Sequence, residues 1–194
     1  MTQDSTTDTS DDLQDVGLHE QITAIKDLAQ QEFYPIDKLA AHRDNIPHVA
    51  VSIFIFREDH LLLQRRAHTK YHSAGLWANS VCTHPRWKES IESCADRRLH
   101  DELGWHVPMN KFAEISYASA VGNLYENEYV HCFYGLHDHS NDIQEFNRTE
   151  VAEVKWVPFD EIEQQIKTDP DAYSAWFKIY MDEHRHLFTE IVGP

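Results

Sequence analysis

A cysteine and a histidine, Cys82 and His84, stand two residues apart in the stretch 77–85. In an extended chain alternate side chains point to the same face, so these two would lie together. A thiol can hold or release a proton, and an imidazole can do the same or ligate a metal. The stretch alone also fits a buried cysteine beside a structural histidine, so its role depends on the residues around it.

Two carboxylates with the same spacing occur in the strand-like segment 125–134. Period two would place Glu126 and Glu128 on one face, which continues with the apolar side chains of Val130 and Cys132. Carboxylates that close raise each other's pKa unless a cation lies between them. A solvated strand end is the plain alternative, but the buried character of the face favours a metal site or a catalytic pair.

Charged residues also occur on the apolar side of a predicted helix. The segment from Ser90 to Leu103, followed by Gly104 as a C-terminal cap, has helical periodicity, and the same spacing brings Arg98 and Glu102 onto or beside the apolar face. Charges near a core are costly unless they are paired or bind a ligand. An ion pair at the rim of the helix is the structural alternative.

Strands and helices alternate irregularly around these residues. Residues 49–56 are continuously apolar and predict a buried strand, which a turn at 57–60 joins to a second strand ending at Arg66. A loop spans 67–76, a strand is expected around Tyr117, and a polar loop spans 137–148. The pattern predicts a mixed α/β (α+β) sheet in a single domain.

The segments before and after this region differ in how clearly they predict secondary structure. Residues 21–37 fit either a helical stripe or two short strands, and periodicity does not decide between them. After a last strand at 154–157 and a short helix from 158 to about 166, Asp169-Pro170 predicts one final helix reaching about Phe188. The expected inward stripe of that helix consists of Trp176, Ile179, Tyr180 and Leu187.

Composition excludes some partners. Among 194 residues, Lys plus Arg number 17 and Asp plus Glu number 33, so the formal net charge is -16. Such a surface disfavours nucleic acid and anionic membrane, and an anionic substrate would need cations gathered locally. Three cysteines without framework spacing, no membrane-spanning run and no signal-peptide pattern indicate a cytoplasmic protein. Residues 1–16 are expected to form a disordered acidic tail and 17–194 the folded domain.

The expected helix also carries a motif. It reads Glu89-x7-Arg97-Arg98-Leu99-x-Asp101-Glu102-Leu103-Gly104. This resembles the Nudix box, Gly-x5-Glu-x7-Arg-Glu-hydrophobic-x-Glu-Glu-x-Gly, whose glutamates bind the magnesium of a diphosphate in hydrolases of that superfamily. Here Thr83 stands at the leading glycine, Arg98 at the first glutamate after the arginine, and Asp101 at a metal-binding glutamate. The departures argue against ordinary diphosphate hydrolysis.

The same departures resemble type I isopentenyl diphosphate isomerases. The matching motifs are Lys38-Leu39-Ala40-Ala41-His42, Pro47-His48, Asn79-Ser80-Val81-Cys82-x-His84-Pro85, Arg97-Arg98, Glu102-Leu103-Gly104, Tyr125-Glu126-Asn127-Glu128 and Trp176 within 172–176. The resemblance covers roughly residues 20–185. It implies a Nudix-like α/β/α sandwich and favours two strands over a helix for 21–37.

The resemblance implies two metal sites and a substrate. One divalent metal, Mn²⁺, Zn²⁺ or Mg²⁺, would be bound by His42, His48, His84, Glu126 and Glu128. Glu102 would hold Mg²⁺ together with the diphosphate of a small isoprenoid substrate. The side chains implied to face that diphosphate are Lys38, Arg66, Lys70 and Arg98. The remaining histidines have no such support and are expected to be structural or superficial.

The implied reaction moves a double bond between isopentenyl and dimethylallyl diphosphate. One proton must be delivered and another removed through a carbocation-like state, which requires two acid–base groups. By resemblance these are Cys82 and Glu128, with Tyr117 hydrogen-bonded near Glu128 and Trp176 offering its ring to the cation. A Nudix hydrolase of nucleoside or other diphosphates, and a metal-dependent binding protein without activity, are the alternatives. Monomer and homodimer are equally open.

Overall fold

A computed structural model describes residues 19–138 and 145–192 of the chain. The tail expected at 1–16 and part of the loop expected at 137–148 lie outside the described residues. The strands are β1 (Gln21–Asp27), β2 (Glu32–Asp37), β3 (His48–Arg57), β4 (His60–Arg66), β5 (Trp77–Ala78), β6 (Val81–Thr83), β7 (Met109–Val121), β8 (Leu124–Leu136) and β9 (Val151–Pro158). The helices are α1 (Lys38–Arg43), α2 (Ile91–Leu103), α3 (Ile162–Thr168), α4 (Ala175–Glu183) and α5 (Thr189–Val192).

Strand β3 lies at the centre of a mixed sheet. It runs parallel to β8 from the pair His48–Glu128 to the pair Phe56–Leu136, and antiparallel to β6. At its end it meets β4, whose other neighbours are β5 and β9, while β7 extends the sheet beyond β8. Every residue of β3 before Arg57 is buried, as its unbroken apolar sequence predicts.

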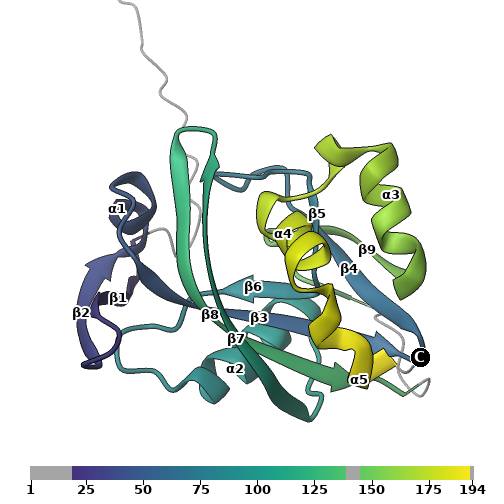
Figure 1. The fold of residues 1–194 in the computed structure, drawn as a ribbon, viewed down its shortest axis with the longest axis horizontal. Coiled ribbons are helices and arrows are strands. Elements are labelled where there is room, and N and C mark those ends of the chain that lie inside the picture. The colour runs from purple at the N-terminus through teal and green to yellow at the C-terminus, as the bar shows by residue number, and fades with distance from the viewer. Residues whose placement is uncertain (1–18, 139–144, 193–194) are drawn as a thin grey trace, which may run out of the picture.

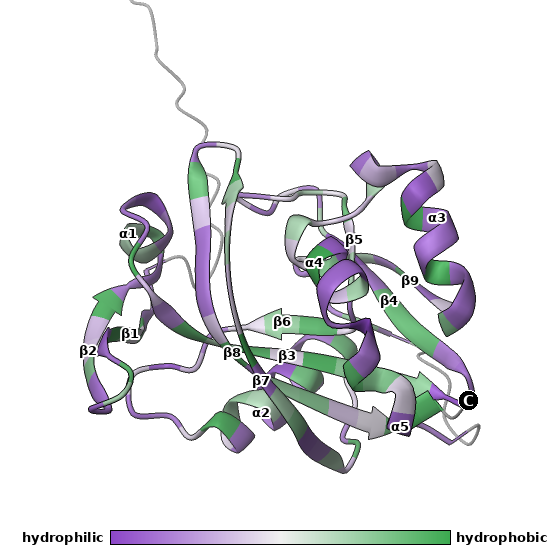
Figure 2. Ribbon diagram, viewed as in Figure 1, coloured by the Kyte–Doolittle hydropathy of each residue, from purple (hydrophilic) through white to green (hydrophobic). Residues whose placement is uncertain are grey.

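Each face of the sheet is covered by helices, which gives the α/β/α sandwich (Figure 1). Successive residues of β3 point to opposite faces, so Ile53 packs toward Leu99 of α2 and Phe54 packs toward Phe177 of α4. The central strands are the most hydrophobic elements in Figure 2, whereas α3 carries a strongly polar outer side. The expected fold class is therefore confirmed. Among the described residues, no helix has the length and apolar character needed to cross a membrane.

Helix α2 has the ends that its sequence predicts. The Ser90 hydroxyl accepts a hydrogen bond from the Ser93 amide, and Gly104 closes the helix with φ 71°, in the left-handed region. Cys94, Ala95 and Leu99 are buried on the sheet side, and Glu102 is buried with them. The expectation of a charged residue on the apolar face is confirmed.

Residues 21–37 form two strands, as the resemblance favours. Strands β1 and β2 make an antiparallel hairpin with the pairs Gln21–Asp37 to Asp27–Glu32. The hairpin is followed by α1, whose N-cap is the Asp37 carboxylate bonded to the Ala40 amide at 2.9 Å. Ile22 and Ala24 are fully buried and alternate with more exposed residues, so β1 follows the two-residue period of a strand rather than the period of a helix.

The prediction of one final helix from Asp169 to about Phe188 is wrong. Pro170 opens a 3-10 turn that ends at Ala172, and Tyr173 is extended. The Ser174 amide donates to the Trp77 carbonyl at 2.9 Å, so a contact with β5 interrupts the helix before α4 begins. A second 3-10 turn, at 185–188, separates α4 from α5. The buried face of α4 contains Trp176, Phe177, Tyr180 and Met181, whereas Ile179 is half-buried.

Candidate active site

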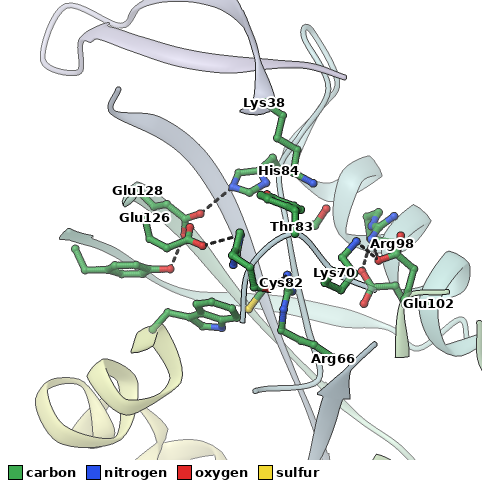
Figure 3. A pocket seen from close by; sticks show the side chains of 15 residues that line it. Lys38, Arg66, Lys70, Cys82, Thr83, His84, Arg98, Glu102, Glu126 and Glu128 are labelled. Atoms are coloured by element: carbon green, nitrogen blue, oxygen red, sulfur yellow. Dashed lines mark hydrogen bonds and ion pairs between the residues drawn. The ribbon is translucent and has the colours of Figure 1, made fainter. Parts of the chain in front are cut away.

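Eight parts of the fold meet around one pocket: α1, the end of β4, the loop 67–76, β6, α2, the β7–β8 hairpin, the segment before β9 and the start of α4. The side chains that line it are Lys38, Arg66, Lys70, Tyr71, His72, Cys82, Thr83, His84, Arg98, Glu102, Tyr117, Glu126, Glu128, Glu150 and Trp176. In Figure 3, Glu126 and Glu128 lie at one end, Lys70, Arg98 and Glu102 at the other, and Cys82 between them.

The first end contains a cluster of potential metal ligands. One ligand atom from each of five residues lies within 4.8 Å of every other; the residues are His42, His48, His84, Glu126 and Glu128. The sheet register brings them together, because His48 at the start of β3 is paired with Glu128 on β8. The Nε2 atom of His84 is 2.8 Å from Glu128 Oε1 and 3.2 Å from His48 Nε2.

The backbone orients two of these imidazoles for metal binding. Nδ1 of His42 donates to the Lys38 carbonyl at 2.7 Å, and Nδ1 of His48 donates to the Ile46 carbonyl at 2.7 Å. A carbonyl can only accept, so the proton resides on Nδ1 and the lone pair on Nε2 points into the cluster. Among the described residues, the buried Nε2 of His42 has no hydrogen-bond partner. Converging nitrogen and carboxylate lone pairs fit a divalent cation such as Mn²⁺ or Zn²⁺.

The pKa values of the two carboxylates in the cluster are shifted in opposite directions. Burial and the neighbouring charge of Glu128 raise the pKa of Glu126 well above its usual value. Burial also acts to raise the pKa of Glu128, but the interactions with the His48 and His84 imidazoles outweigh it and hold that pKa well below its usual value. Glu128 is therefore the ionised member of the pair, and the Tyr117 hydroxyl donates to its Oε2 at 2.5 Å.

Cys82 carries a proton in this environment. Burial, together with the negative charge of Glu128, raises the pKa of its thiol to about 12. The thiol donates to Asn79 Oδ1 at 2.9 Å, and the Asn79 amide nitrogen donates to the carbonyls of Ile53 and Val81. Because both amide protons are used, the Asn79 side chain presents its oxygen to the sulfur. Ser52 Oγ lies 3.4 Å from the same sulfur.

Trp176 forms the side of the pocket that α4 contributes. Its ring is nearly buried, and the Arg66 guanidinium lies over it at 5.3 Å from the centroid. The ring nitrogen has no hydrogen-bond partner within the described part of the chain. Because the chain is extended just before α4 begins, Trp176 stands in the first turn of that helix, where its buried side chain also lines the pocket.

The opposite end of the pocket is cationic. Glu102 is 2% exposed; its Oε1 accepts from Arg98 Nη2 at 2.5 Å and its Oε2 from Gln64 Nε2 at 3.0 Å. Lys70 lies at this end as well, and Arg66 and Lys38 line the same pocket. The cations that a diphosphate would need are therefore gathered in this pocket, together with a buried carboxylate suited to Mg²⁺.

Four residues that line the pocket were not predicted for the site: Tyr71, His72, Thr83 and Glu150. His72, expected to be structural or superficial, lies inside with its Nε2 3.2 Å from Glu126 Oε1. Glu150, in the polar segment before β9, contacts both Lys70 and Arg98. Both belong to irregular segments, where no periodicity indicates the direction of a side chain. All the residues predicted for the site do lie in the pocket or the metal-ligand cluster.

Comparison with known proteins agrees with the fold and motifs. The NUDIX domain family model matches residues 46–177. The isopentenyl-diphosphate Delta-isomerase of Dinoroseobacter shibae is 45% identical over 153 residues, covering 77% of this chain and 86% of that protein. The same-named protein of Rhodobacter capsulatus is 39% identical over 155 residues, covering 79% and 88%.

A solved structure extends the likeness to the fold. A crystal structure of a Deinococcus radiodurans protein matches with a TM-score of 0.68 at 14% identity, covering 86% of this chain and 100% of that one. At that identity the likeness concerns the fold alone, whereas the sequence relatives share most of their length with this chain. The chain therefore belongs to the isopentenyl-diphosphate Delta-isomerase family of NUDIX-domain proteins.

Proposed function

We propose that this protein is an isomerase that interconverts isopentenyl and dimethylallyl diphosphate, for isoprenoid biosynthesis in the cytoplasm. The observation that carries the proposal is that Cys82 lines one pocket together with Glu128, which belongs to the metal-ligand cluster, and lies between that cluster and a cationic end. The curated relatives carry the name of this activity. The free thiols of Cys82, Cys94 and Cys132 agree with a reducing compartment.

The chain supplies one proton donor and one proton acceptor. Cys82 holds its proton and Glu128 is ionised, so the pair can add a proton to one carbon and remove one from another. Tyr117 steadies the Glu128 carboxylate through its hydrogen bond. The face of Trp176 would stabilise positive charge that develops between them, and the enclosed pocket would exclude water that quenches it.

The cationic end would bind the diphosphate. Lys70 and Arg98 lie at that end, Lys38 and Arg66 line the same pocket, and Glu102 would hold Mg²⁺ at the cationic end. A second ion, Mn²⁺, Zn²⁺ or Mg²⁺, would be bound by the His/Glu cluster. Bound metal supplies positive charge that orders the carboxylates and neutralises the phosphates.

The hydrolase alternative has little support in the pocket. Of the box residues, Glu89 is engaged by Arg97 at 2.6 and 2.8 Å, and Asp101 is an exposed partner of the same arginine. Glu102 is the box carboxylate that lines the pocket. A hydrolase that positions its metals with several box carboxylates would need more than one of them to reach the substrate.

The test is proton NMR of isopentenyl diphosphate with the purified protein, Mg²⁺ and Mn²⁺ in deuterated buffer. We expect dimethylallyl diphosphate containing deuterium, because the proton added by the protein exchanges with solvent. Release of phosphate or a monophosphate would instead assign a hydrolase. Metal binding without either product would leave a binding protein.

Two substitutions test the acid–base pair. Cys82→Ala and Glu128→Gln should each lower turnover by at least about 10²-fold, the range typical of general acid–base groups. Glu114→Gln is the matched control, since Glu114 lies on β7 and contacts Lys111 and Tyr129 outside the pocket. Thermal unfolding should show that all three variants are folded. Near-normal turnover in either pocket variant would remove that residue from the mechanism.

A further inference from the structure

Glu150 is a half-buried carboxylate at the cationic end of the pocket with no role in the chemistry above. Its Oε2 accepts from Lys70 Nζ at 3.0 Å and lies 3.3 Å from Arg98 Nη2. The side chains of Glu150 and Lys70 are only 13% and 6% exposed. Two cations implied in diphosphate binding are thus already in contact with an internal anion.

The backbone holds Glu150 in this position. Its carbonyl accepts from the Ala67 amide at 2.9 Å, and its own amide donates to the Asn147 carbonyl at 3.0 Å. The first bond ties it to the loop 67–76, which carries Lys70, and Val151 next to it is fully buried at the start of β9. The main chain of Glu150 is therefore held beside the loop that carries Lys70, so its carboxylate stays within reach of both cations.

Arg98 is shared between two carboxylates. Its Nη2 is 2.5 Å from Glu102 Oε1 and 3.3 Å from Glu150 Oε2. A diphosphate arriving alone would bring more negative charge against both carboxylates and would have to displace them from Arg98. A divalent cation arriving with the diphosphate offsets that charge, and in a largely desolvated pocket the difference is not screened away.

We propose that Glu150 makes diphosphate binding at this site dependent on a divalent cation, because its fixed negative charge opposes a metal-free diphosphate at Lys70 and Arg98. The proposal rests on the isomerase function proposed above and assigns a specificity role to a residue outside the Nudix-like motif. The charge is present at neutral pH: burial acts to raise the pKa of Glu150, but Arg98 and Lys70 hold that pKa below its usual value.

The test is isothermal titration of inorganic pyrophosphate into the full chain, with and without Mg²⁺, after loading the His/Glu cluster with Zn²⁺ and removing free metal. The variants are Glu150→Gln and the control Glu153→Gln. Glu153 lies nearby in β9, which begins just after Glu150; it is 55% exposed and faces Arg65 at 3.6 Å rather than the pocket. Thermal unfolding of each variant checks folding, and metal content is measured after each titration.

For Glu150→Gln we expect metal-free pyrophosphate to bind about tenfold more tightly, the effect of one ion-pair contact of about 1.4 kcal/mol. Affinity in the presence of Mg²⁺ should stay equal or fall, so the ratio of the two affinities shrinks. The control should keep the ratio of the unsubstituted protein. A role that merely holds Lys70 and Arg98 in place would weaken both affinities together and leave the ratio unchanged.

An unchanged ratio in Glu150→Gln overturns the proposal. If the unsubstituted protein still converts isopentenyl diphosphate in the NMR assay, that result removes the role of Glu150 and leaves the proposed function standing. Absence of pyrophosphate binding by the unsubstituted protein even with Mg²⁺ would overturn the diphosphate assignment of the cationic end and the role of Glu150 with it.

Discussion

At the scale of single residues, the site depends on which atoms each side chain has left to offer. His42 and His48 commit Nδ1 to backbone carbonyls and present Nε2, and Asn79 commits its amide protons and presents its oxygen to Cys82. The partners of His42 and His48 are backbone carbonyls four and two residues away, whereas Asn79 also reaches the carbonyl of Ile53 on a neighbouring strand. Residue types alone therefore indicate the kind of chemistry, whereas the protonated atom is set by the neighbours.

The ring of Trp176 gives a prediction at this scale. Trp176→Leu should lower turnover about thirtyfold, because a desolvated cation–π contact is worth about 2 kcal/mol and 1.36 kcal/mol is a factor of ten. Trp176→Phe should retain more activity, since it keeps a π face and breaks no hydrogen bond that the structure shows for the ring nitrogen. Steady-state kinetics on both variants checks this, with thermal unfolding as the folding control. Equal activity in the two variants would contradict a role for the π face.

At the scale of elements, α2 links the core to the pocket. One side packs Cys94, Ala95 and Leu99 against the sheet, and the next residues along that side bring Arg98 and Glu102 to the cationic end. The caps at Ser90 and Gly104 satisfy backbone groups at the two ends of α2, so a change at either cap alters the stability of the whole helix.

Gly104 provides the prediction at this scale. Gly104→Ala should lower the free energy of unfolding by about 1–2 kcal/mol, the cost of the left-handed conformation for a residue with a Cβ. The added Cβ would meet the Glu145 carbonyl at an ordinary contact of 3.4 Å, so crowding adds little. Gly104→Asn is the matched control and should cost less, because asparagine tolerates this conformation. Urea denaturation measures all three proteins, and an equal loss in both variants would assign the effect to contacts rather than to backbone conformation.

At the scale of the whole molecule, the pocket brings distant parts of the chain together and buries several titratable side chains, whose charged forms are disfavoured there. Burial, the largest cause in each case, lowers the pKa of His42, His72 and His84 below the ordinary 6.5. In the metal-free protein these three histidines therefore bind protons less readily in the native state than in the unfolded chain. Glu126 acts in the opposite sense through its raised pKa, but with a single proton against three.

The metal-free protein should therefore lose stability as the pH falls below about 6.5, by up to about 1.4 kcal/mol per pH unit for each histidine. Loading the cluster with Zn²⁺ should raise the free energy of unfolding near neutral pH, because a ligand that binds the native state stabilises it. Urea denaturation between about pH 7 and pH 5, with and without metal, measures both effects. A flat profile in the metal-free protein would contradict the burial of neutral histidines.

Local sequence rules were sufficient for much of the fold. The apolar run of β3, the alternation in β8 and the caps of α2 each depend on neighbours within a few residues, and the structure confirms all three. The final helix was mispredicted because a hydrogen bond from Ser174 to Trp77, almost a hundred positions away, outweighs helical propensity.

By itself the sequence determined the fold class, the family and the residue types of the site, since each is encoded in short motifs and periodicities. Only the tertiary structure decided that His72 and Glu150 enter the pocket, which atom of each histidine faces the cluster, and which carboxylate is ionised. The physical reason is that desolvation and ion pairing depend on what packs around a group in space. For Glu150 and His72 those neighbours, Lys70 and Glu126, lie far away in the sequence, and no local pattern records them.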